Sequence, residues 1–165
     1  MNLPDPNATQ RVVDSLQFDE VPASQAPMEL LLLADPSPEK VQGYLGLSRC
    51  FVARHAGTAV GAYVVQERAR GTHELMSIAV APSHQHQGIG TLLLKHAVDW
   101  VRHSGARRLE VGTGTFGYQL SFYQRLGFRV VAIDRDFFLD HYPEPLFEDG
   151  IQHKDMLRLA LDYRS

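Results

Sequence analysis

The sequence has few of the features that mark secreted, membrane-spanning or nucleic-acid-binding proteins. It contains one cysteine, Cys50, in 165 residues, which excludes an internal disulfide framework. The longest uninterrupted apolar run, residues 30–34, is too short to cross a bilayer, and the N-terminus has neither the basic nor the apolar segment of a secretory signal. A net charge of −3 offers no basic footprint for nucleic acid. We therefore expect a cytoplasmic protein that binds neither membranes nor nucleic acids.

The features that are present suit one folded domain. The hydrophobic content of 44% and the charged content of 21% are ordinary for a globular protein, and 165 residues can enclose a substantial core. We expect a single domain over residues 1–165. Residues 1–9 hold two prolines and two asparagines, so we expect this terminus to be loose.

The chain is organised around residues 74–105. Residues 74–80 are compact and mostly apolar, and Pro82 cannot continue a strand ladder, so a strand is expected before it. From Gly88 onward the apolar residues recur at steps of three and four, which predicts an amphipathic helix that ends at Gly105. The pattern is a strand, a short polar turn and a long helix.

The turn between this strand and this helix is predicted to bind an anion. Gly88 and Gly90 lack a Cβ, so a ligand can approach the backbone, and the first N–H groups of a helix have no internal partner. A pyrophosphate fits such a site; a tight turn that merely starts a helix is the alternative. The turn is not a P-loop, because Thr91 and Leu92 follow Gly90, and it is not a dinucleotide fingerprint, because Leu93 occupies the place of the third glycine.

The remaining periodicity predicts further strands and helices. Strands are expected at residues 10–16, 49–54, 59–68, 107–111, 128–133 and 156–161, and helices at residues 28–34, 38–45 and 116–126. A mixed sheet with helices on both faces is the natural layering of these elements. Residues 112–115 are expected to form a loop. Residues 134–153 are expected to form a long aromatic connection that packs on itself or belongs to a dimer contact or a site, with a wall on the substrate side favoured.

Two motifs in this order resemble the GNAT superfamily of N-acetyltransferases. The first is Gln-x-x-Gly-x-Gly at residues 85–90, and the second is Phe-Tyr-x-x-x-Gly-Phe at residues 122–128. The resemblance implies an α/β fold with a mixed, mostly antiparallel sheet of about six or seven strands and helices on both faces. Two positions depart from the family, since Phe116 replaces a frequent asparagine and Gln119 a frequent alanine.

By this resemblance acetyl-CoA is the co-substrate. The pantetheine arm would lie along Ile78, Ala79 and Val80, with the Ile78 N–H polarising the thioester carbonyl. The residues implied to bind the pyrophosphate are Gln85, His86, Gln87, Gly88, Ile89, Gly90 and Thr91. Tyr123 would lie by the cofactor sulfur and act as the acid toward the leaving thiolate, with an ordinary pKa near 10.

The base that takes the proton of the amine is left open. Glu74 precedes Gln85 by eleven residues, which matches a glutamate that some family members use directly or through a water. A solvated glutamate at the start of a strand is the alternative. His73 and His141 are the other candidates, and strand alternation places His73 and Glu74 on opposite faces.

The implied activity is transfer of the acetyl group to a primary amine, of a small molecule, by direct attack in a ternary complex. A GNAT fold that holds CoA without turnover is one alternative, although such a module has no need of Tyr123. An enzyme for protein N-termini or lysines is another. The eight histidines have no cysteine or paired carboxylate to complete a zinc set, so no metal is expected. The sequence leaves open which amine is the acceptor and whether the protein forms a homodimer.

Overall fold

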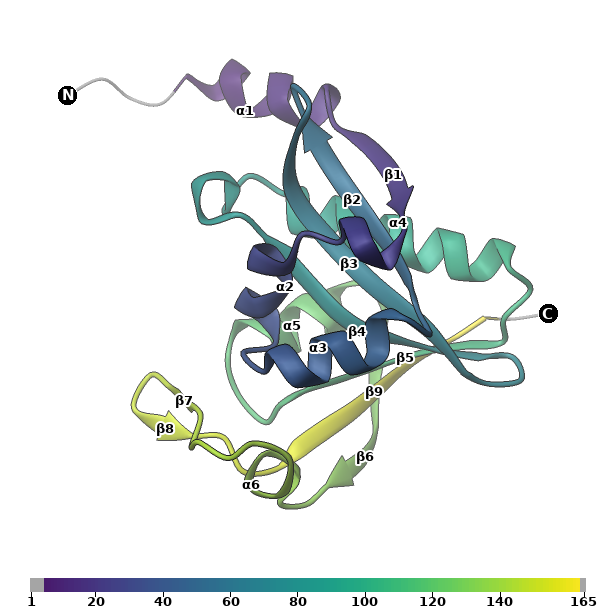
Figure 1. Cartoon of the computed structure of the whole chain (residues 1–165), viewed down its shortest axis with the longest axis vertical. Coiled ribbons are helices and arrows are strands. Elements are labelled where there is room, and N and C mark those ends of the chain that lie inside the picture. The colour runs from purple at the N-terminus through teal and green to yellow at the C-terminus, as the bar shows by residue number, and fades with distance from the viewer. Residues whose placement is uncertain (1–4, 164–165) are drawn as a thin grey trace. The chain divides into compact units, whose positions relative to one another are not determined.

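The computed structural model describes residues 5–163, and seven strands form its main sheet (Figure 1). Their order is β1-β2-β3-β4-β5-β9-β6. The strands are β1 Gln17–Val21, β2 Arg49–His55, β3 Thr58–Ala69, β4 Thr72–Val80, β5 Arg108–Gly114, β6 Arg129–Asp134 and β9 Met156–Asp162. β4 and β5 pair in parallel, whereas β1–β2, β2–β3, β5–β9 and β6–β9 are antiparallel. The predicted fold class, a mixed and mostly antiparallel sheet with helices, is confirmed.

Six α-helices and a small hairpin complete the described part of the chain. The helices are α1 Pro6–Asp14, α2 Met28–Ala34, α3 Pro38–Leu45, α4 Ile89–His103, α5 Tyr118–Arg125 and α6 Phe137–His141, and the hairpin pairs β7 Phe147–Glu148 with β8 Ile151–Gln152. Short 3-10 turns occur at Ala23–Gln25 and Pro82–His84. The chain divides into two compact units. One comprises the chain up to Gln66 plus Met76–Ala97, and the other comprises Glu67–Leu75 plus the chain from Val98 onward.

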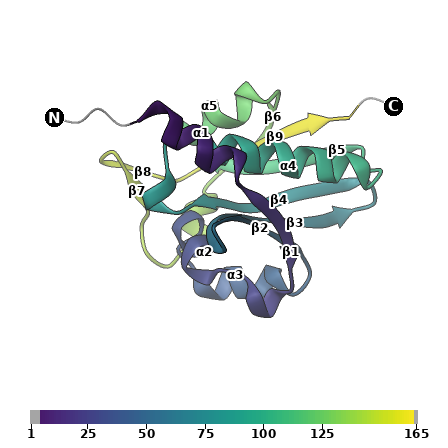
Figure 2. The same ribbon diagram turned by 90° about the horizontal axis from the view of Figure 1, so that it is seen from above.

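In the first unit, helices cover both faces of β1–β3. Leu31 of α2 and Val41 of α3 are fully buried, in a core that also contains Val52 of β2. The first part of α4 packs closely on the opposite face, because a Cβ at Gly61 of β3 would lie only 2.7 Å from the Leu93 side chain. Figure 2 shows α2 and α3 on one side of these strands and α4 on the other. The apolar stripe that predicted α4 is therefore the surface that meets the sheet.

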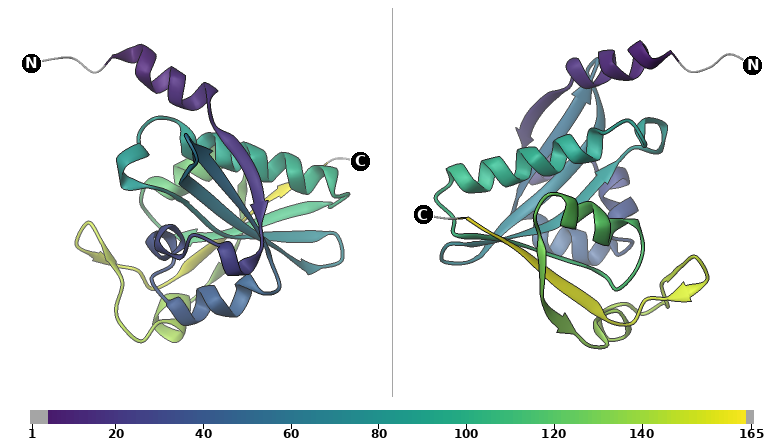
Figure 3. Two further views of the ribbon diagram at one scale, coloured as in Figure 1. Left: turned by 45° about the horizontal axis from the view of Figure 1, so that its top comes forward. Right: turned by 180° about the vertical axis from the view of Figure 1, so that it is seen from behind.

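In the second unit, β5 leads through α5 into the edge strand β6 (Figure 3). α5 buries Phe122 and Tyr123. Its C-terminus is closed by two backbone bonds, Phe128 N–H to Tyr123 C=O at 3.3 Å and Gly127 N–H to Gln124 C=O at 3.0 Å. This is the Schellman arrangement, and it confirms Gly127 as the residue that ends the helix.

The N-terminal segment differs from its prediction. The strand expected at residues 10–16 is wrong, because Pro6–Asp14 is a helix. Asp5 caps this helix by accepting a hydrogen bond from the Asn7 N–H at 2.9 Å. Residues 6–9, which were expected to be loose, belong to the same helix, and residues 1–4 lie outside the described residues. A pattern this short fits the period of a strand as well as that of a helix, and the N-cap at Asp5 favours the helix.

Two expected loops contain more regular structure than predicted. β5 continues to Gly114, so the loop expected at residues 112–115 is mostly strand. The long connection at residues 134–153 contains α6 and the β7–β8 hairpin. Its His153 ring stacks on Phe116 with 4.5 Å between ring centroids, and lies 5.4 Å from Phe138. The connection therefore packs both through its own aromatic residues and against Phe116.

Candidate active site

The predicted anion-binding turn lies where β4 ends and α4 begins. Pro82–His84 forms a 3-10 turn directly after β4, and α4 begins at Ile89. The Leu92 N–H donates to the Gly88 carbonyl at 3.2 Å. Because helical N–H groups bond to the carbonyl four residues earlier, the N–H groups of Ile89, Gly90 and Thr91 have no partner within the helix.

Gly88 leaves open space beside these N–H groups. Its φ of +85° is one that L side chains rarely adopt, and a Cβ built on it would find nothing within 4 Å. The helix dipole adds a partial positive charge at this end of α4. Free amides, positive potential and open space together suit a phosphate group.

Side chains of the turn make different contributions. Gln85 and His86 are exposed, and Gln85 Nε2 donates to the Val80 carbonyl at 3.1 Å, which ties the turn to the end of β4. Gln87 Oε1 is buried and has no hydrogen-bond partner among residues 5–163. Ile89 is only 1% exposed, so its backbone N–H is all that it can offer to a ligand.

The strand residues implied to hold the pantetheine arm come just before the turn. Ile78 and Val80 are half-buried on one face of β4, and Ala79 is buried on the other. The Ala81 N–H donates to the Val60 carbonyl of β3 at 2.8 Å, which fixes the end of β4. These residues thus belong to a strand whose end is anchored to β3.

Tyr123 is a buried residue of α5, with 4% of its surface exposed. Its ring centroid lies 5.2 Å from that of Phe122 and 5.8 Å from that of Phe128. Burial raises the pKa of the Tyr123 phenol above its ordinary value, because the apolar surroundings penalise the phenolate. The hydroxyl therefore keeps its proton at neutral pH and can serve as a hydrogen-bond donor.

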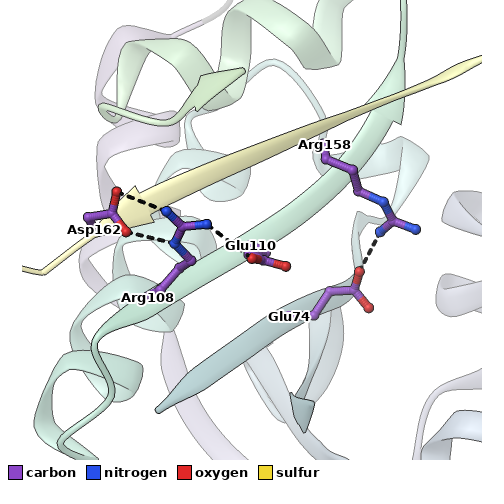
Figure 4. A network of polar contacts seen from close by, with 5 residues as sticks. All are labelled: Glu74, Arg108, Glu110, Arg158 and Asp162. Carbon is purple, nitrogen blue, oxygen red and sulfur yellow. Dashed lines mark hydrogen bonds and ion pairs between the residues drawn. The ribbon is translucent and has the colours of Figure 1, made fainter. Parts of the chain in front are cut away.

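Glu74 lies in β4 with its carboxylate bound by arginine side chains. Its side chain is 13% exposed, and Oε1 accepts from Arg158 Nη1 of β9 at 2.6 Å (Figure 4). Glu74 Oε2 lies 3.8 Å from Arg68 Nε, and Arg158 Nη2 lies 3.4 Å from Asp134 Oδ2. The carboxylate is thus part of an ion-pair network, and Oε2 is its less tightly held oxygen.

A second ion-pair group joins β5 and β9. Arg108 Nε is 2.7 Å from Asp162 Oδ1, and Arg108 Nη1 is 3.4 Å from Glu110 Oε1 (Figure 4). Asp162 is 63% exposed at its side chain, whereas the Glu74 side chain is largely buried. The two groups therefore offer a matched comparison of an exposed and a shielded pair.

The other two candidate bases have different surroundings. His73 is 8% exposed on the face of β4 opposite Glu74, and its ring meets Trp100 edge-on at 6.1 Å. Burial lowers the pKa of His73, because it disfavours the charged imidazolium. His141 is exposed, and its Nδ1 lies 2.8 Å from the Phe137 carbonyl oxygen.

Arg158 is the residue that the sequence analysis missed. It is separated from Glu74 by 84 positions, and pairing of β4 with β5 and of β5 with β9 brings the two together. Alternation in the last strand, which places Arg158 and Asp162 on one face, was the available signal. No local motif marks it.

Within residues 5–163, no cluster of three or more His, Cys, Asp or Glu side chains could hold a metal ion. None of the helices described here has the length and apolarity needed to span a membrane.

Comparison with known proteins identifies the family. The model of the Acetyltransferase (GNAT) family matches residues 15–128. The Uncharacterized N-acetyltransferase YvbK of Bacillus subtilis is 46% identical over 135 residues, which are 81% of this chain and 87% of that protein. Streptothricin acetyltransferase of Streptomyces lavendulae is 31% identical over 128 residues, which are 73% of this chain and 67% of that protein. A crystal structure of a GNAT family acetyltransferase from Elizabethkingia anophelis with acetyl-CoA bound is 38% identical, with a TM-score of 0.88 over 91% of this chain and 99% of that one.

The fold, the amide-lined turn and these matches define an acyltransferase that uses acetyl-CoA. The chain belongs to the GNAT family of N-acetyltransferases, as the two sequence motifs predicted.

Proposed function

We propose that the protein transfers the acetyl group of acetyl-CoA to the primary amine of a small molecule, by direct attack in a ternary complex. The observation that carries the proposal is the start of α4. There, the free N–H groups of Ile89, Gly90 and Thr91 adjoin the open space at Gly88. In this assignment these amides bind the pyrophosphate. The turn residues Gln85, His86 and Gln87 surround it, and the backbone of Ile78, Ala79 and Val80 holds the pantetheine arm.

The proposed reaction forms a C–N bond and breaks a C–S bond. A neutral amine attacks the thioester carbon, and the Ile78 N–H stabilises the charge that develops on the carbonyl oxygen. The C–S bond then breaks and CoA leaves as a thiolate, while the attacking nitrogen loses its extra proton to a base.

Tyr123 is proposed to stabilise the leaving thiolate. A thiol has an ordinary pKa of about 8.5, and burial raises the pKa of Tyr123 above about 10, so complete proton transfer from the phenol to sulfur is uphill. The buried O–H is therefore assigned as a hydrogen-bond donor to the sulfur, and the final proton comes from solvent.

Glu74 is proposed as the base, directly or through a water. Its Oε1 is held by Arg158, which fixes the carboxylate, and its Oε2, which lies 3.8 Å from Arg68 Nε and is less tightly held, is assigned to accept the proton. His73 is the weaker candidate because it is buried on the opposite face.

A small-molecule acceptor is favoured by two observations. Streptothricin acetyltransferase, at 31% identity, is named for a small-molecule substrate. The connection at residues 134–153 packs through Phe138 and His153, and such aromatic side chains suit the wall of a closed pocket.

The experiment is thiol release from acetyl-CoA with a panel of acceptors. We expect turnover with one or more small primary amines and little with peptides that carry a free N-terminus or lysine. Preferential turnover of peptides would contradict the small-molecule assignment. Tight CoA binding without turnover on any acceptor would indicate a silent CoA-binding module and remove the enzymatic proposal.

A further inference from the structure

The guanidinium of Arg158 binds two carboxylates through different nitrogens. Nη1 donates to Glu74 Oε1 at 2.6 Å, and Nη2 donates to Asp134 Oδ2 at 3.4 Å. A single hydrogen bond therefore joins Arg158 to Glu74 (Figure 4). Arginine and a carboxylate frequently form two parallel hydrogen bonds instead, which occupy both carboxylate oxygens. In the arrangement found here, Arg158 leaves Glu74 Oε2 without such a bond.

The ring of Phe137 adds a third contact to this guanidinium. Arg158 Cζ lies 5.5 Å from the ring centroid, within the range over which an aromatic face attracts a cation. The Phe137 ring is itself stacked on His141, with 4.2 Å between ring centroids. Because a guanidinium is planar and stacks on aromatic faces, the ring restricts the directions in which Nη1 and Nη2 can point.

The short helix α6, which carries Phe137, is anchored to the residues directly before β9. The Asp136 N–H donates to Asp155 Oδ1 at 2.8 Å, and the Phe138 N–H donates to the Lys154 carbonyl at 3.0 Å. Both chain neighbours of Phe137 are thus bonded to the segment that leads into β9. These bonds hold the ring beside the guanidinium, which belongs to the same strand.

We propose that Asp134 and Phe137 are positioning residues, which hold Arg158 on one oxygen of Glu74 and keep the other oxygen available for the proton of the amine. This inference rests on the proposed role of Glu74 as the base. When Asp134 is removed, Nη2 loses its acceptor and can turn to Glu74 Oε2. When the ring is removed, the guanidinium is free to rotate into the same arrangement. In both cases the base loses the oxygen that accepts the proton.

A crystal structure of Asp134→Ala tests this geometry without turnover. The Asp134 side chain is 46% exposed, so the variant is expected to fold. We expect Nη1 and Nη2 of Arg158 each to lie within about 3 Å of a different oxygen of Glu74. A guanidinium that keeps a single bond to Glu74 in this variant contradicts the proposal.

Steady-state kinetics test the consequence for turnover, with the primary amine that the wild type acetylates fastest. Asp134→Ala and Phe137→Leu should each lower kcat about tenfold, and should change the Kd for acetyl-CoA less than about twofold. Phe137→Tyr keeps the aromatic face and should retain the wild-type kcat. Asp162→Ala is the matched control, because it removes an exposed carboxylate from the Arg108 pair and should leave kcat unchanged. An unchanged kcat in Asp134→Ala or in Phe137→Leu overturns the proposal.

The same two substitutions in a Glu74→Gln background distinguish positioning from general damage. Residues that act through the Glu74 carboxylate should not lower kcat further once that carboxylate is absent. Equal fold losses in both backgrounds would give Asp134 and Phe137 a structural role, which overturns this proposal and leaves the base assignment standing. A wild-type kcat in Glu74→Gln alone would overturn the base assignment, and this inference with it.

Discussion

The turn at residues 85–91 and the ion-pair network around Arg158 are built in opposite ways. The turn uses consecutive residues, and its N–H groups exist because α4 begins at Ile89. The network joins Glu74 of β4, Asp134 of β6 and Arg158 of β9, which only sheet pairing brings together. A site made of backbone groups is set by helix and turn geometry, whereas a charged site made of side chains depends on long-range register.

This difference predicts how each region responds to substitution. A backbone site is disturbed mainly when a side chain occupies its space. A side-chain network is disturbed when one charge is removed and its partners remain partly buried.

The largest expected effect is on cofactor binding in Gly88→Ala. The added methyl group enters the open space beside the free N–H groups, so we expect the Kd for acetyl-CoA, measured by calorimetry, to rise about 100-fold. Gly105→Ala is the matched control, because Gly105 has the same φ of +85° and also has nothing within 4 Å of a built Cβ. Both variants should lose similar thermal stability. Equal Kd values for the two variants would contradict the assignment of the open space at Gly88 to the cofactor.

A smaller effect is expected on turnover in Tyr123→Phe. Loss of the hydroxyl removes the proposed donor to the thiolate, so kcat should fall about 30-fold, while the Kd for CoA changes less than about twofold. Tyr118→Phe, five residues earlier on α5 at a residue 69% exposed, should leave both constants unchanged. Full kcat in Tyr123→Phe would remove the phenol from the chemistry.

The network is expected to show its effect in stability. Arg158→Gln leaves Glu74 and Asp134 without their shared guanidinium, so the free energy of unfolding should fall by about 2 kcal/mol. Arg108→Gln breaks a pair whose Asp162 is 63% exposed, and should cost no more than about 1 kcal/mol. Urea denaturation measures both, and equal losses would show that shielding does not distinguish the two pairs.

The smallest effect concerns His73 and the pH dependence of stability. Burial lowers the pKa of His73 in the folded state, so below about pH 6.5 the unfolded chain binds a proton that the folded chain does not. The contribution of His73 to the free energy of unfolding is therefore fully present above that pH. It is lost as the pH falls, by at most about 1.4 kcal/mol per pH unit. His73→Gln should flatten the acid side of the stability profile, and an unchanged slope would exclude His73 as its source.

Local chemistry explains which parts of the fold could be predicted. The helices at residues 28–34 and 38–45 have the expected bounds, and Ser37 caps the second by accepting from the Lys40 N–H at 3.3 Å. The turn at Gly88 and the cap at Gly127 were likewise predictable, because each depends on a few adjacent residues.

The features that were predicted wrongly or missed do not depend on a few adjacent residues in this way. The segment that forms α1 was predicted to be a strand, because its apolar pattern is too short to distinguish the period of a strand from that of a helix. The ion pair between Glu74 and Arg158 depends on the order β4-β5-β9, which no local pattern contains. The packing of His153, which belongs to the connection at residues 134–153, on Phe116 is a tertiary contact of the same kind.

The most direct test of the account is an NMR titration that follows the backbone amides of Ile89, Gly90 and Thr91. Addition of CoA should shift these three amide resonances strongly, whereas pantetheine, which lacks the pyrophosphate, should leave them nearly in place. Unshifted amides on saturation with CoA, or equal shifts with pantetheine, would contradict the assignment of this turn as the diphosphate site.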